Sequence, residues 1–372
     1  MIQEPQSVQM FCGIRIGETM NDKTGRLCVT TEYSILDAIK VLDETHERIV
    51  LIVEEDRLLG VLTDSDVRKS ILRGQDMSEK VTEIMTTNPI CVTPGTADSA
   101  VEIMERHGID AVPVIDENRR VVDLIFRYET PSGRKKSGAG LNAPVVIMAG
   151  GKGTRLFPYT QVLPKPLIPI GNTTILEQVI DSFAEEGCRD FYLSINYKKN
   201  LIKAYFQDME PSYHVTYLEE ERFLGTAGSL YLAKDRIRES FFVSNCDILL
   251  DISYADVMKF HKEKGNVITM ITSLKNYTIP YGVVNIDGSG QVESLSEKPE
   301  MNFLVNTGVY VLEPEVLDMI PKERFMHITE LIQMCMDQGK KVGVYPVTEK
   351  AWEDMGELAG MEEMLRSRGT KE

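Results

Sequence analysis

A glycine-dense and basic segment covers residues 150–169, directly after the apolar run 145–149. Three of its first four residues are glycines, which leave backbone N–H groups open to a polyphosphate and permit positive φ angles. Lys152, Arg155 and Lys165 add three cations to the same segment. Because a nucleoside triphosphate and a departing pyrophosphate are strongly anionic, this pattern predicts a loop that holds a triphosphate.

Two other classes of glycine loop fit this segment poorly. A dinucleotide-binding loop opens directly into a helix, whereas prolines at 158, 164, 166 and 169 exclude an immediate long helix here. A P-loop has Gly-Lys followed directly by Ser or Thr, whereas Lys152 is followed by Gly153. We therefore expect neither a dehydrogenase nor a P-loop NTPase.

The segment closely resembles the signature of the sugar-1-phosphate nucleotidyltransferases, which make nucleotide sugars. The match is G-G-x-G-T-R-L, then Pro and Thr, then P-K-P-L-x-P, with every fixed position present. The resemblance covers about residues 144–372, where five further motifs follow in the expected order. They are Leu224-Gly225-Thr226-Ala227-Gly228, Asn245-Cys246-Asp247, Glu297-Lys298-Pro299, Asn306-Thr307-Gly308-Val309-Tyr310 and Trp352-Glu353-Asp354-Met355-Gly356.

This resemblance implies attack of a sugar phosphate on the α-phosphorus of a triphosphate, with release of pyrophosphate and with Mg²⁺ as cofactor. It implies that Arg155 and Lys165 act as the catalytic cations that hold the phosphates. It also implies that Asp247 and Asp354 hold the metal, in keeping with the one or two carboxylates that magnesium usually takes. The residues expected at the nucleotide are Ala149, Gly150, Gly151, Gly153, Thr154, Gly225 and Thr226, and those expected at the sugar phosphate are Glu297, Lys298, Asn306, Thr307 and Gly308.

Two features leave the metal ligands open to other interpretations. Asp247 follows the apolar run 241–243, and an aspartate after a strand often caps a helix. Asp354 is followed by Met355, where the family often has Thr, although the carboxylate itself is kept.

The amino-terminal part of the chain contains an internal repeat of about sixty residues, which is too long for a solenoid repeat. Met20, Val29 and Ala38 recur as Met85, Val92 and Ala100, and Arg57-Leu58-Leu59 recurs as Arg120-Val121-Val122. The repeat resembles a tandem pair of CBS domains, a module that senses adenosyl ligands, most clearly at residues 60–66. The resemblance implies that Thr63 and Asp66 hold an adenine or guanine nucleotide. The second copy has Phe126 and Glu129 at the matching positions, so a packing or dimerisation module without a ligand is the alternative.

The composition excludes several other classes of protein. A formal net charge of -16 argues against general nucleic-acid binding. We find no uninterrupted apolar stretch of membrane-spanning length and no signal peptide, so we expect a cytoplasmic protein that does not enter membranes. Six widely spaced cysteines without a C-x-x-C motif support neither a disulfide framework nor a zinc site.

We expect two folded parts joined by a tether. A tandem CBS pair of the α+β class is predicted over 15–130, a small and basic linker over 131–142, and a nucleotidyltransferase domain over 143–372. In the last part, helical patterns at 175–186 and 254–264 are followed by strand patterns at 191–195 and 267–271. Such alternation predicts an α/β domain with a Rossmann-like, mostly parallel sheet covered on both faces.

The sequence indicates the nucleotide base and the acceptor sugar less directly than it indicates the type of reaction. A CBS pair ahead of a short nucleotidyltransferase is similar to the glucosamine-1-phosphate guanylyltransferases of legionaminic acid biosynthesis, which favours GTP, GDP-glucosamine as product, and a homodimer or higher homo-oligomer. Glu219, Glu220 and Glu221 precede Leu224, and a carboxylate can accept from guanine N1 and N2, although a solvated acidic turn explains them equally well. Mannose-1-phosphate guanylylation, glucose-1-phosphate thymidylylation or uridylylation, and a non-catalytic nucleotide sensor are the alternatives.

Overall fold

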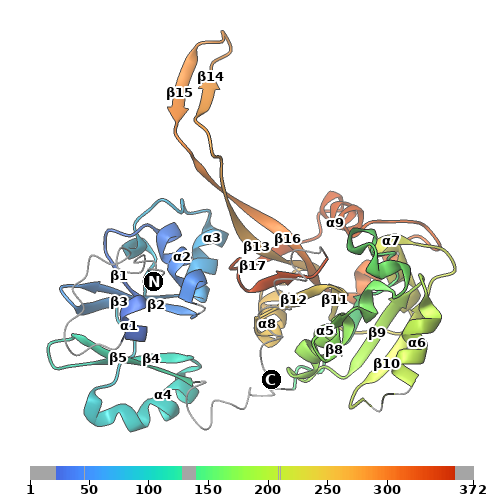
Figure 1. Ribbon diagram of the computed structural model, residues 1–372, viewed down its shortest axis with the longest axis horizontal. Coiled ribbons are helices and arrows are strands. Elements are labelled where there is room, and N and C mark those ends of the chain that lie inside the picture. Colours follow the sequence, from blue (N-terminus) through green and yellow to red (C-terminus); the bar gives the residue numbers. More distant parts are fainter. Residues whose placement is uncertain (1–21, 46, 128–139, 208, 210, 357–372) are drawn as a thin grey trace, which may run out of the picture. The chain divides into compact units, whose positions relative to one another are not determined.

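A computed structural model describes residues 22–45, 47–127, 140–207, 209 and 211–356 of the chain (Figure 1). The chain divides into two compact units, Met1–Lys136 and Ser137–Glu372. The predicted linker 131–142 and the first residues of the predicted repeat module fall largely outside the described residues. Each unit is therefore described by itself.

Unit 1 contains two copies of one strand and helix pattern. Its helices and strands are α1 (Asp22–Arg26), β1 (Cys28–Thr30), α2 (Ile35–Thr45), β2 (Ile49–Glu54), β3 (Arg57–Thr63), α3 (Asp64–Arg73), α4 (Ala100–His107), β4 (Ala111–Ile115) and β5 (Val121–Phe126). In the first copy β1 pairs in parallel with β2, and β2 pairs in antiparallel with β3. In the second copy a parallel bridge from Val92 to Val114 takes the place of the β1–β2 pairing, and β4 pairs in antiparallel with β5.

In unit 1, residues at equivalent positions of the internal repeat are buried alike. Ala38 of α2 and Ala100 of α4 are both buried, as the repeat in the sequence predicts. The antiparallel bridge between Arg57 and Arg120 joins the two copies at equivalent positions. A second antiparallel bridge joins Val61 to Thr86, and Gly60 lies against it, because a Cβ on Gly60 would come within 2.7 Å of the carbonyl oxygen of Thr86. The repeat is therefore a structural one.

Unit 2 is built on a seven-stranded sheet with the order β10-β9-β6-β11-β16-β13-β17. The strands are β6 (Val145–Met148), β9 (Asp190–Ile195), β10 (His214–Glu219), β11 (Phe241–Asn245), β13 (Ile268–Thr278), β16 (Glu300–Leu312) and β17 (Val342–Val347). All neighbouring pairs are parallel except those that β16 makes with β11 and β13. The predicted mostly parallel α/β sheet is confirmed.

Helices cover both faces of this sheet. They are α5 (Ile175–Ala184), α6 (Lys199–Gln207), α7 (Gly225–Gly228), α8 (Tyr254–Lys264) and α9 (Ile328–Asp337). Helices α5, α6 and α8 pack into one buried cluster, and α7 and α9 pack into a second one. Short-range signals set the helix ends: Thr174 and Glu177 exchange hydrogen bonds at the start of α5, and Ser253 accepts from the Asp256 N–H at the start of α8.

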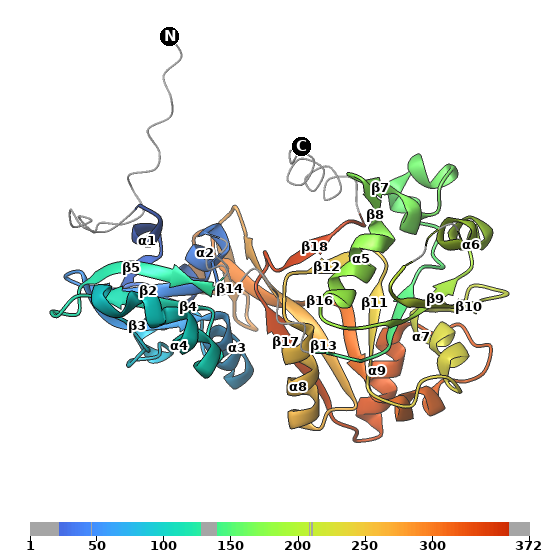
Figure 2. The same cartoon turned by 90° about the horizontal axis from the view of Figure 1, so that it is seen from below.

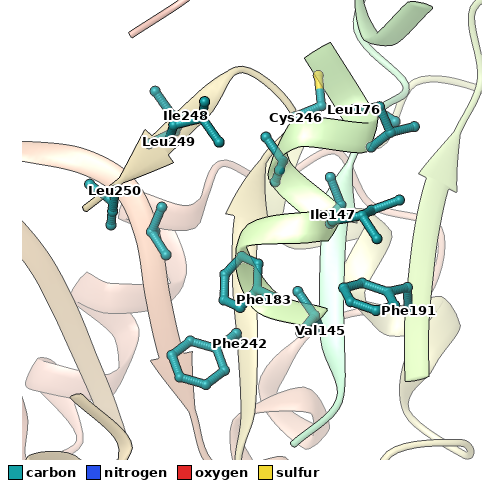
Figure 3. Packing of buried hydrophobic residues seen from close by; sticks show 14 of the residues in the cluster. Val145, Ile147, Leu176, Phe183, Phe191, Phe242, Cys246, Ile248, Leu249 and Leu250 are labelled. Atoms are coloured by element: carbon teal, nitrogen blue, oxygen red, sulfur yellow. The ribbon is translucent and has the colours of Figure 1, made fainter. Parts of the chain in front are cut away.

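An aromatic group ties α5 and α8 to the sheet. The Phe183 ring of α5 stacks on Tyr254 of α8 with centroids 3.9 Å apart, and lies 5.3 Å from the ring of Phe242 of β11. Figure 3 shows Phe183 beside Phe242 and Val145, with Ile147 farther along the same strand. Because the ring of Phe183 is fully buried, replacing it with Ala would cost about 3–5 kcal/mol of stability.

Three smaller pairs of strands lie outside this sheet. Strands β12 (Ile248–Leu250) and β18 (Trp352–Asp354) form an antiparallel pair, and they lie side by side in Figure 2. Strands β14 (Val283–Ile286) and β15 (Val292–Ser296) form a hairpin at the far end of the long β13–β16 ribbon (Figure 1). A short hairpin, β7 (Pro169–Ile170) with β8 (Thr173–Thr174), precedes α5.

Two kinds of feature are absent from the described residues: a membrane-spanning helix and a clustered metal site. None of the helices there combines the length and the hydropathy that crossing a bilayer requires. Histidine, cysteine, aspartate and glutamate side chains do not gather there in groups of three or more that could hold a metal ion.

Candidate active site

The glycine-dense segment leaves the carboxyl end of β6 and runs into three short 3₁₀ turns instead of a helix. These turns are Thr154–Leu156, Tyr159–Gln161 and Lys165–Leu167. The N–H of Ala149 still donates to Ser194 of β9, so the loop starts from a fixed strand. The prediction that the prolines prevent an immediate long helix is confirmed.

Gly153 lets this loop fold back on itself. Its φ is 64°, and a Cβ there would come within 2.9 Å of both Lys165 Cβ and Thr160 Cγ2. Any larger residue would therefore push Lys165 away from the start of the loop. Tyr197 and Lys198, which follow β9, brace the far side: Tyr197 Oη donates to Thr160 O at 3.2 Å, and Lys198 Nζ donates to Val162 O at 2.7 Å.

Lys165 reaches the end of β11. Its ammonium group forms an ion pair with the Asp247 carboxylate, and the two side chains are only 12% and 8% exposed. Asp247 stands in the turn between β11 and β12 and does not cap a helix. Burying this carboxylate without the cation would carry a large desolvation cost.

Asp354 reaches the same place from the end of the chain. In the β12–β18 pairing Ile248 lies opposite Asp354, and the N–H of Met355 donates to Asp247 O at 2.9 Å. The Gly356 N–H donates to Asp354 Oδ1 at 2.7 Å. These backbone contacts bring two carboxylates together that are far apart in the sequence.

Gly356 shows how closely the charged groups meet. A Cβ at this residue would lie 2.6 Å from Asp247 Oδ2, 2.7 Å from Asp354 Oδ1 and 3.2 Å from Arg155 Nη2. Three charged groups thus surround one point that a larger side chain would fill. Burial, and then the neighbouring Asp247, raise the pKa of Asp354, whereas Lys165 and Arg155 counteract that rise. The structure brings Arg155, Lys165, Asp247 and Asp354 together, and Lys152 is exposed on the same loop.

This pair of carboxylates fits a divalent, oxygen-preferring cation. Both donors are carboxylate oxygens, and both lie within one short radius of the Gly356 Cβ position. Magnesium commonly takes one or two protein carboxylates and completes its shell with phosphate oxygens and water. The donor set therefore suits magnesium better than zinc, whose protein sites are built mainly from Cys and His.

The second glycine loop is packed against the start of α9. Gly225 has a φ of 77°, and a Cβ there would come within 2.5 Å of Met326 O. Thr226 Oγ1 accepts from the Ile328 N–H at 2.9 Å, and Met326 O accepts from the N–H of Ala227. The predicted nucleotide residues Gly225 and Thr226 therefore lie at the start of the short helix α7, held against the segment that leads into α9.

Asn306, Thr307 and Gly308 lie inside β16 beside β11. A Cβ on Gly308 would overlap the side-chain amide of Asn245, the residue with which β11 ends. Thr307 is 2% exposed, and its Oγ1 donates to Ile271 O at 2.9 Å, so this hydroxyl is used within the sheet. Asn306 Nδ2 donates to Tyr310 Oη at 2.7 Å.

Glu297 and Lys298 lie at the other end of the β13–β16 ribbon. They follow β15 and precede Glu300, the first residue of β16, whereas Gly308 stands eight residues into that strand. Eight residues of extended strand rise about 26 Å, so the structure does not bring these two side chains to the aspartate pair. Gly282 packs against Glu297, since a Cβ on Gly282 would lie 3.0 Å from Glu297 Oε2.

Glu220 is a buried carboxylate, which the sequence alone does not distinguish from the adjacent Glu219 and Glu221. It is 4% exposed, whereas Glu219 is exposed and pairs with Lys199 and Lys203. Glu220 accepts from Ser194 Oγ at 2.8 Å and from the Leu224 N–H at 2.7 Å. A Cβ on Gly150 would come within 2.7 Å of Glu220 Oε1, so this carboxylate borders the triphosphate loop.

Burial raises the pKa of Glu220, and its two hydrogen bonds counteract that rise. Glu220 is the second residue of a run of three glutamates, and only burial distinguishes it from the other two. An alternating pattern in the strand that precedes it, 214–219, would have been a weak signal.

Thr63 and Asp66 in unit 1 are bonded to each other. Thr63 Oγ1 and its N–H donate to Asp66 Oδ2 at 2.8 and 3.1 Å, which caps the start of α3. In the second copy Phe126 is 4% exposed and fills the matching position with a buried ring. Glu129, its other departure from the family pattern, lies outside the described residues.

Comparison with protein families accounts for most of the chain. The model described as "Nucleotidyl transferase" matches residues 144–368, which is more than half of the chain. The chain belongs to the nucleotidyl transferase family. The CBS domain model matches residues 20–73 and 81–128, so this nucleotidyl transferase carries a CBS pair at its amino-terminal side.

Curated relatives cover part of this nucleotidyl transferase. It is 36% identical to a probable mannose-1-phosphate guanylyltransferase 3 of Oryza sativa subsp. japonica, over 47% of this chain and 51% of the relative. It is 33% identical to a mannose-1-phosphate guanylyltransferase catalytic subunit beta of Dictyostelium discoideum, over 61% of this chain and 66% of the relative. The chain thus spans about half the length of the first of these relatives.

Solved structures are more distant in sequence. HddC from Yersinia pseudotuberculosis has a TM-score of 0.49 at 23% identity, over 60% of this chain and 99% of that one. A putative glucose-1-phosphate thymidylyltransferase from Bacillus anthracis has a TM-score of 0.49 at 19% identity, over 62% of this chain and 97% of that one.

Proposed function

We propose that this nucleotidyl transferase transfers a guanylyl group from GTP to a sugar 1-phosphate and releases pyrophosphate. The observation that carries the proposal is the convergence of Arg155, Lys165, Asp247 and Asp354 around Gly356. Two anions must approach each other in such a reaction, so the site has to neutralise charge and hold the groups in line. Two cations and two carboxylates at one strand end meet that need.

The chain's own residues divide this work. Arg155 and Lys165 hold phosphate oxygens and balance the charge that develops on the departing pyrophosphate. Asp247 and Asp354 hold Mg²⁺, which would polarise the phosphate oxygens and orient the triphosphate. The loop 150–154 presents backbone N–H groups to the triphosphate, because its glycines remove the obstructing side chains, and Ala149 anchors the loop to β9 through its own N–H. We assign Gly225 and Thr226 to the nucleotide and Asn306, Thr307 and Gly308 to the sugar phosphate. The family resemblance also assigns Glu297 and Lys298 to the sugar phosphate, although they lie at the outer end of the β13–β16 ribbon.

The choice of guanine rests on Glu220. Its buried carboxylate borders Gly150 and can accept from the N1 and N2 hydrogens of guanine, which uracil and thymine do not present together. The printed names of the curated relatives, which are mannose-1-phosphate guanylyltransferases, support the same base.

Two acceptor sugars have support. The fusion of a CBS pair to a short nucleotidyl transferase favours glucosamine 1-phosphate and hence a role in legionaminic acid biosynthesis. The curated relatives favour mannose 1-phosphate instead. We propose glucosamine 1-phosphate as the first candidate, mannose 1-phosphate as the second, and an adenine or guanine nucleotide at Thr63 and Asp66 as the effector of a cytoplasmic enzyme.

Pyrophosphate release tests the proposal directly. The purified chain is incubated with Mg²⁺, each of GTP, ATP, UTP and dTTP, and glucosamine, mannose or glucose 1-phosphate in turn. We expect release with GTP and one of the first two sugars. Release that prefers UTP or dTTP would contradict the base assignment, and no release with any pair would leave a nucleotide-binding sensor as the function.

A further inference from the structure

Two exposed aromatic rings lie beside the second glycine loop. Phe223 directly precedes that loop, and Phe325 directly precedes Met326, whose backbone packs on it. The two ring centroids are 5.8 Å apart, and the side chains are 52% and 47% exposed. We call these two residues the aromatic pair. The ring of His327 makes a T-shaped contact with Phe325 at 4.8 Å and supports the pair from the side of α9.

The backbone holds the aromatic pair together. Met326 N–H donates to Leu224 O at 2.9 Å, and the aromatic pair consists of the residues directly before these two. On the other side of the pair, Arg222 Nη2 donates to the backbone oxygen of Glu323. Aromatic rings that are already fixed lose little conformational freedom when a ligand binds, so this surface is pre-organised.

The aromatic pair lies next to the carboxylate to which we assigned the choice of base. Leu224, the residue after Phe223, donates its N–H to Glu220 Oε2 at 2.7 Å. The other oxygen of this carboxylate borders Gly150 of the triphosphate loop. The backbone at Phe223 is therefore one hydrogen bond away from the proposed guanine contact.

The size of the aromatic pair suits a small planar ligand. An aromatic side chain buries about 150–250 Å² when it is fully covered, so two half-exposed rings offer roughly 200 Å². A standard protein interface takes about 800 Å² from each partner. One face of a nucleotide base is a better match to this surface than a second protein.

We propose that the aromatic pair holds the purine ring of the nucleotide, a role that rests on the proposed function. Because the two rings are tilted by 49°, only one of them can lie parallel to a base. We assign the parallel stack to Phe223 and an edge contact to Phe325. Stacking depends on the area of the π-face and little on ring substituents. The aromatic pair would thus select purines over the smaller pyrimidines, and Glu220 would select guanine among the purines.

Nucleotide binding without turnover tests the aromatic pair. Calorimetric titration of the full chain with GTP and Mg²⁺, in the absence of any sugar phosphate, measures the affinity. We expect Phe223→Ala to weaken GTP binding at least about 5-fold, which is the lower end of what base stacking on an aromatic ring contributes. Phe325→Ala should have a smaller effect, and Phe223→Tyr should keep the wild-type affinity.

The ribbon supplies a matched control. Phe303 of β16 is 47% exposed, as Phe325 is, and its ring lies 6.1 Å from that of Tyr277 at a tilt of 56°. Phe303→Ala therefore removes a comparable ring from a comparable exposed pair outside the glycine loops. We expect its affinity for GTP to equal that of the wild type.

Inosine triphosphate separates stacking from a structural effect. Inosine keeps the purine ring but lacks the N2 amino group of guanine, so the ratio of GTP affinity to ITP affinity reports the contact with Glu220. We expect Phe223→Ala to weaken both nucleotides equally and to keep this ratio, whereas Glu220→Gln should lower it. If Phe223→Ala merely displaced Leu224 and with it Glu220, the ratio would fall in that variant too.

Three results would overturn this proposal and leave the proposed reaction intact, since the wild type binds GTP in each. They are an unchanged GTP affinity in Phe223→Ala, an equal loss in Phe303→Ala, and a GTP-to-ITP ratio that falls in Phe223→Ala. A wild type that binds UTP as tightly as GTP, or binds no triphosphate, would overturn the aromatic pair and the base assignment together.

Discussion

Asp354 of β18 lies opposite Ile248 of β12, the residue that follows Asp247. The Met355 N–H adds a further backbone hydrogen bond to this strand pair by donating to Asp247 O at 2.9 Å. The distance between the two aspartates is therefore set by a backbone ladder and not by side-chain choice. Every prediction about the metal depends on this ladder.

Replacing either aspartate by asparagine should remove most of the turnover and the metal affinity. We expect Asp247→Asn and Asp354→Asn to lower kcat at least about 100-fold, because metal stabilisation of phosphoryl charge contributes several kcal/mol. Pyrophosphate release measures kcat, and Mn²⁺ titration followed by electron paramagnetic resonance measures binding. Asp251→Asn is the control just after β12. Unchanged Mn²⁺ binding in both variants would show that the metal is held elsewhere.

Gly356→Ala should impair metal binding at the same site although it removes no charged group. The new Cβ would lie 2.6 and 2.7 Å from the two carboxylate oxygens, so at least one carboxylate must move. We expect weaker Mn²⁺ binding and a melting temperature close to that of the wild type. Gly95→Ala is the control, because a Cβ at residue 95 meets nothing within 4 Å. Equal metal affinity in both variants would be incompatible with the proposed site.

Glu220→Gln should change the choice of base. The amide keeps the size of the side chain but replaces one acceptor oxygen by a donor, which faces the N–H groups of guanine. We expect kcat/KM for GTP to fall about 10- to 100-fold, since a hydrogen bond to a charged group contributes about 1.5–3 kcal/mol. Glu219→Gln, an exposed neighbour, should leave the preference intact. A loss shared equally by all four triphosphates would indicate a purely structural role.

His261 should make unit 2 less stable in acid. Burial lowers the pKa of His261 from 6.5, although Glu313 beside it works in the opposite direction and Lys262 adds to the lowering. Its ring nitrogens lie 2.8 Å from Thr269 Oγ1 and 3.0 Å from Glu313 Oε1. A lowered folded pKa means that the unfolded state binds more protons below pH 6.5, so the stability contributed by neutral His261 is present above pH 6.5 and is lost as the pH falls.

Urea unfolding at several pH values checks this sign. The free energy of unfolding of the wild type should fall between pH 7 and the acidic range more steeply than that of His261→Gln, which cannot take up the proton. The difference between the two chains isolates His261 from carboxylates that titrate in both. Parallel curves would contradict the prediction.

Asp66→Ala should abolish nucleotide binding by unit 1. Because Asp66 Oδ2 also caps α3, the variant should lose about 1 kcal/mol of stability even without a ligand. The informative quantity is therefore the shift in melting temperature upon adding an adenine or guanine nucleotide, which the wild type should show and the variant should not. A wild-type melt that no nucleotide changes would leave unit 1 as a packing or dimerisation module.

Local pattern predicted several elements of unit 2, and their bounds can be compared with the structure. The helix expected over 254–264 matches α8 at both ends, because Ser253 and Gly265 supply the caps within the sequence. The helix expected over 175–186 ends two residues earlier, at Ala184. The strand expected over 267–271 is the start of the much longer β13, whose outer half pairs with β16 and carries exposed polar residues that weaken the apolar signal.

The nucleotidyl transferase family, the internal repeat and the cation-rich loop could all be recognised from residue order, because glycine positions, prolines and apolar periodicity act over a few residues. Tertiary structure was needed to pair β12 with β18, to bury Glu220 while Glu219 stays exposed, and to place Lys298 at the outer end of the ribbon. These three outcomes depend on contacts between segments that are distant in the chain. Such contacts form when strands choose partners in a sheet, and no local sequence pattern encodes that choice.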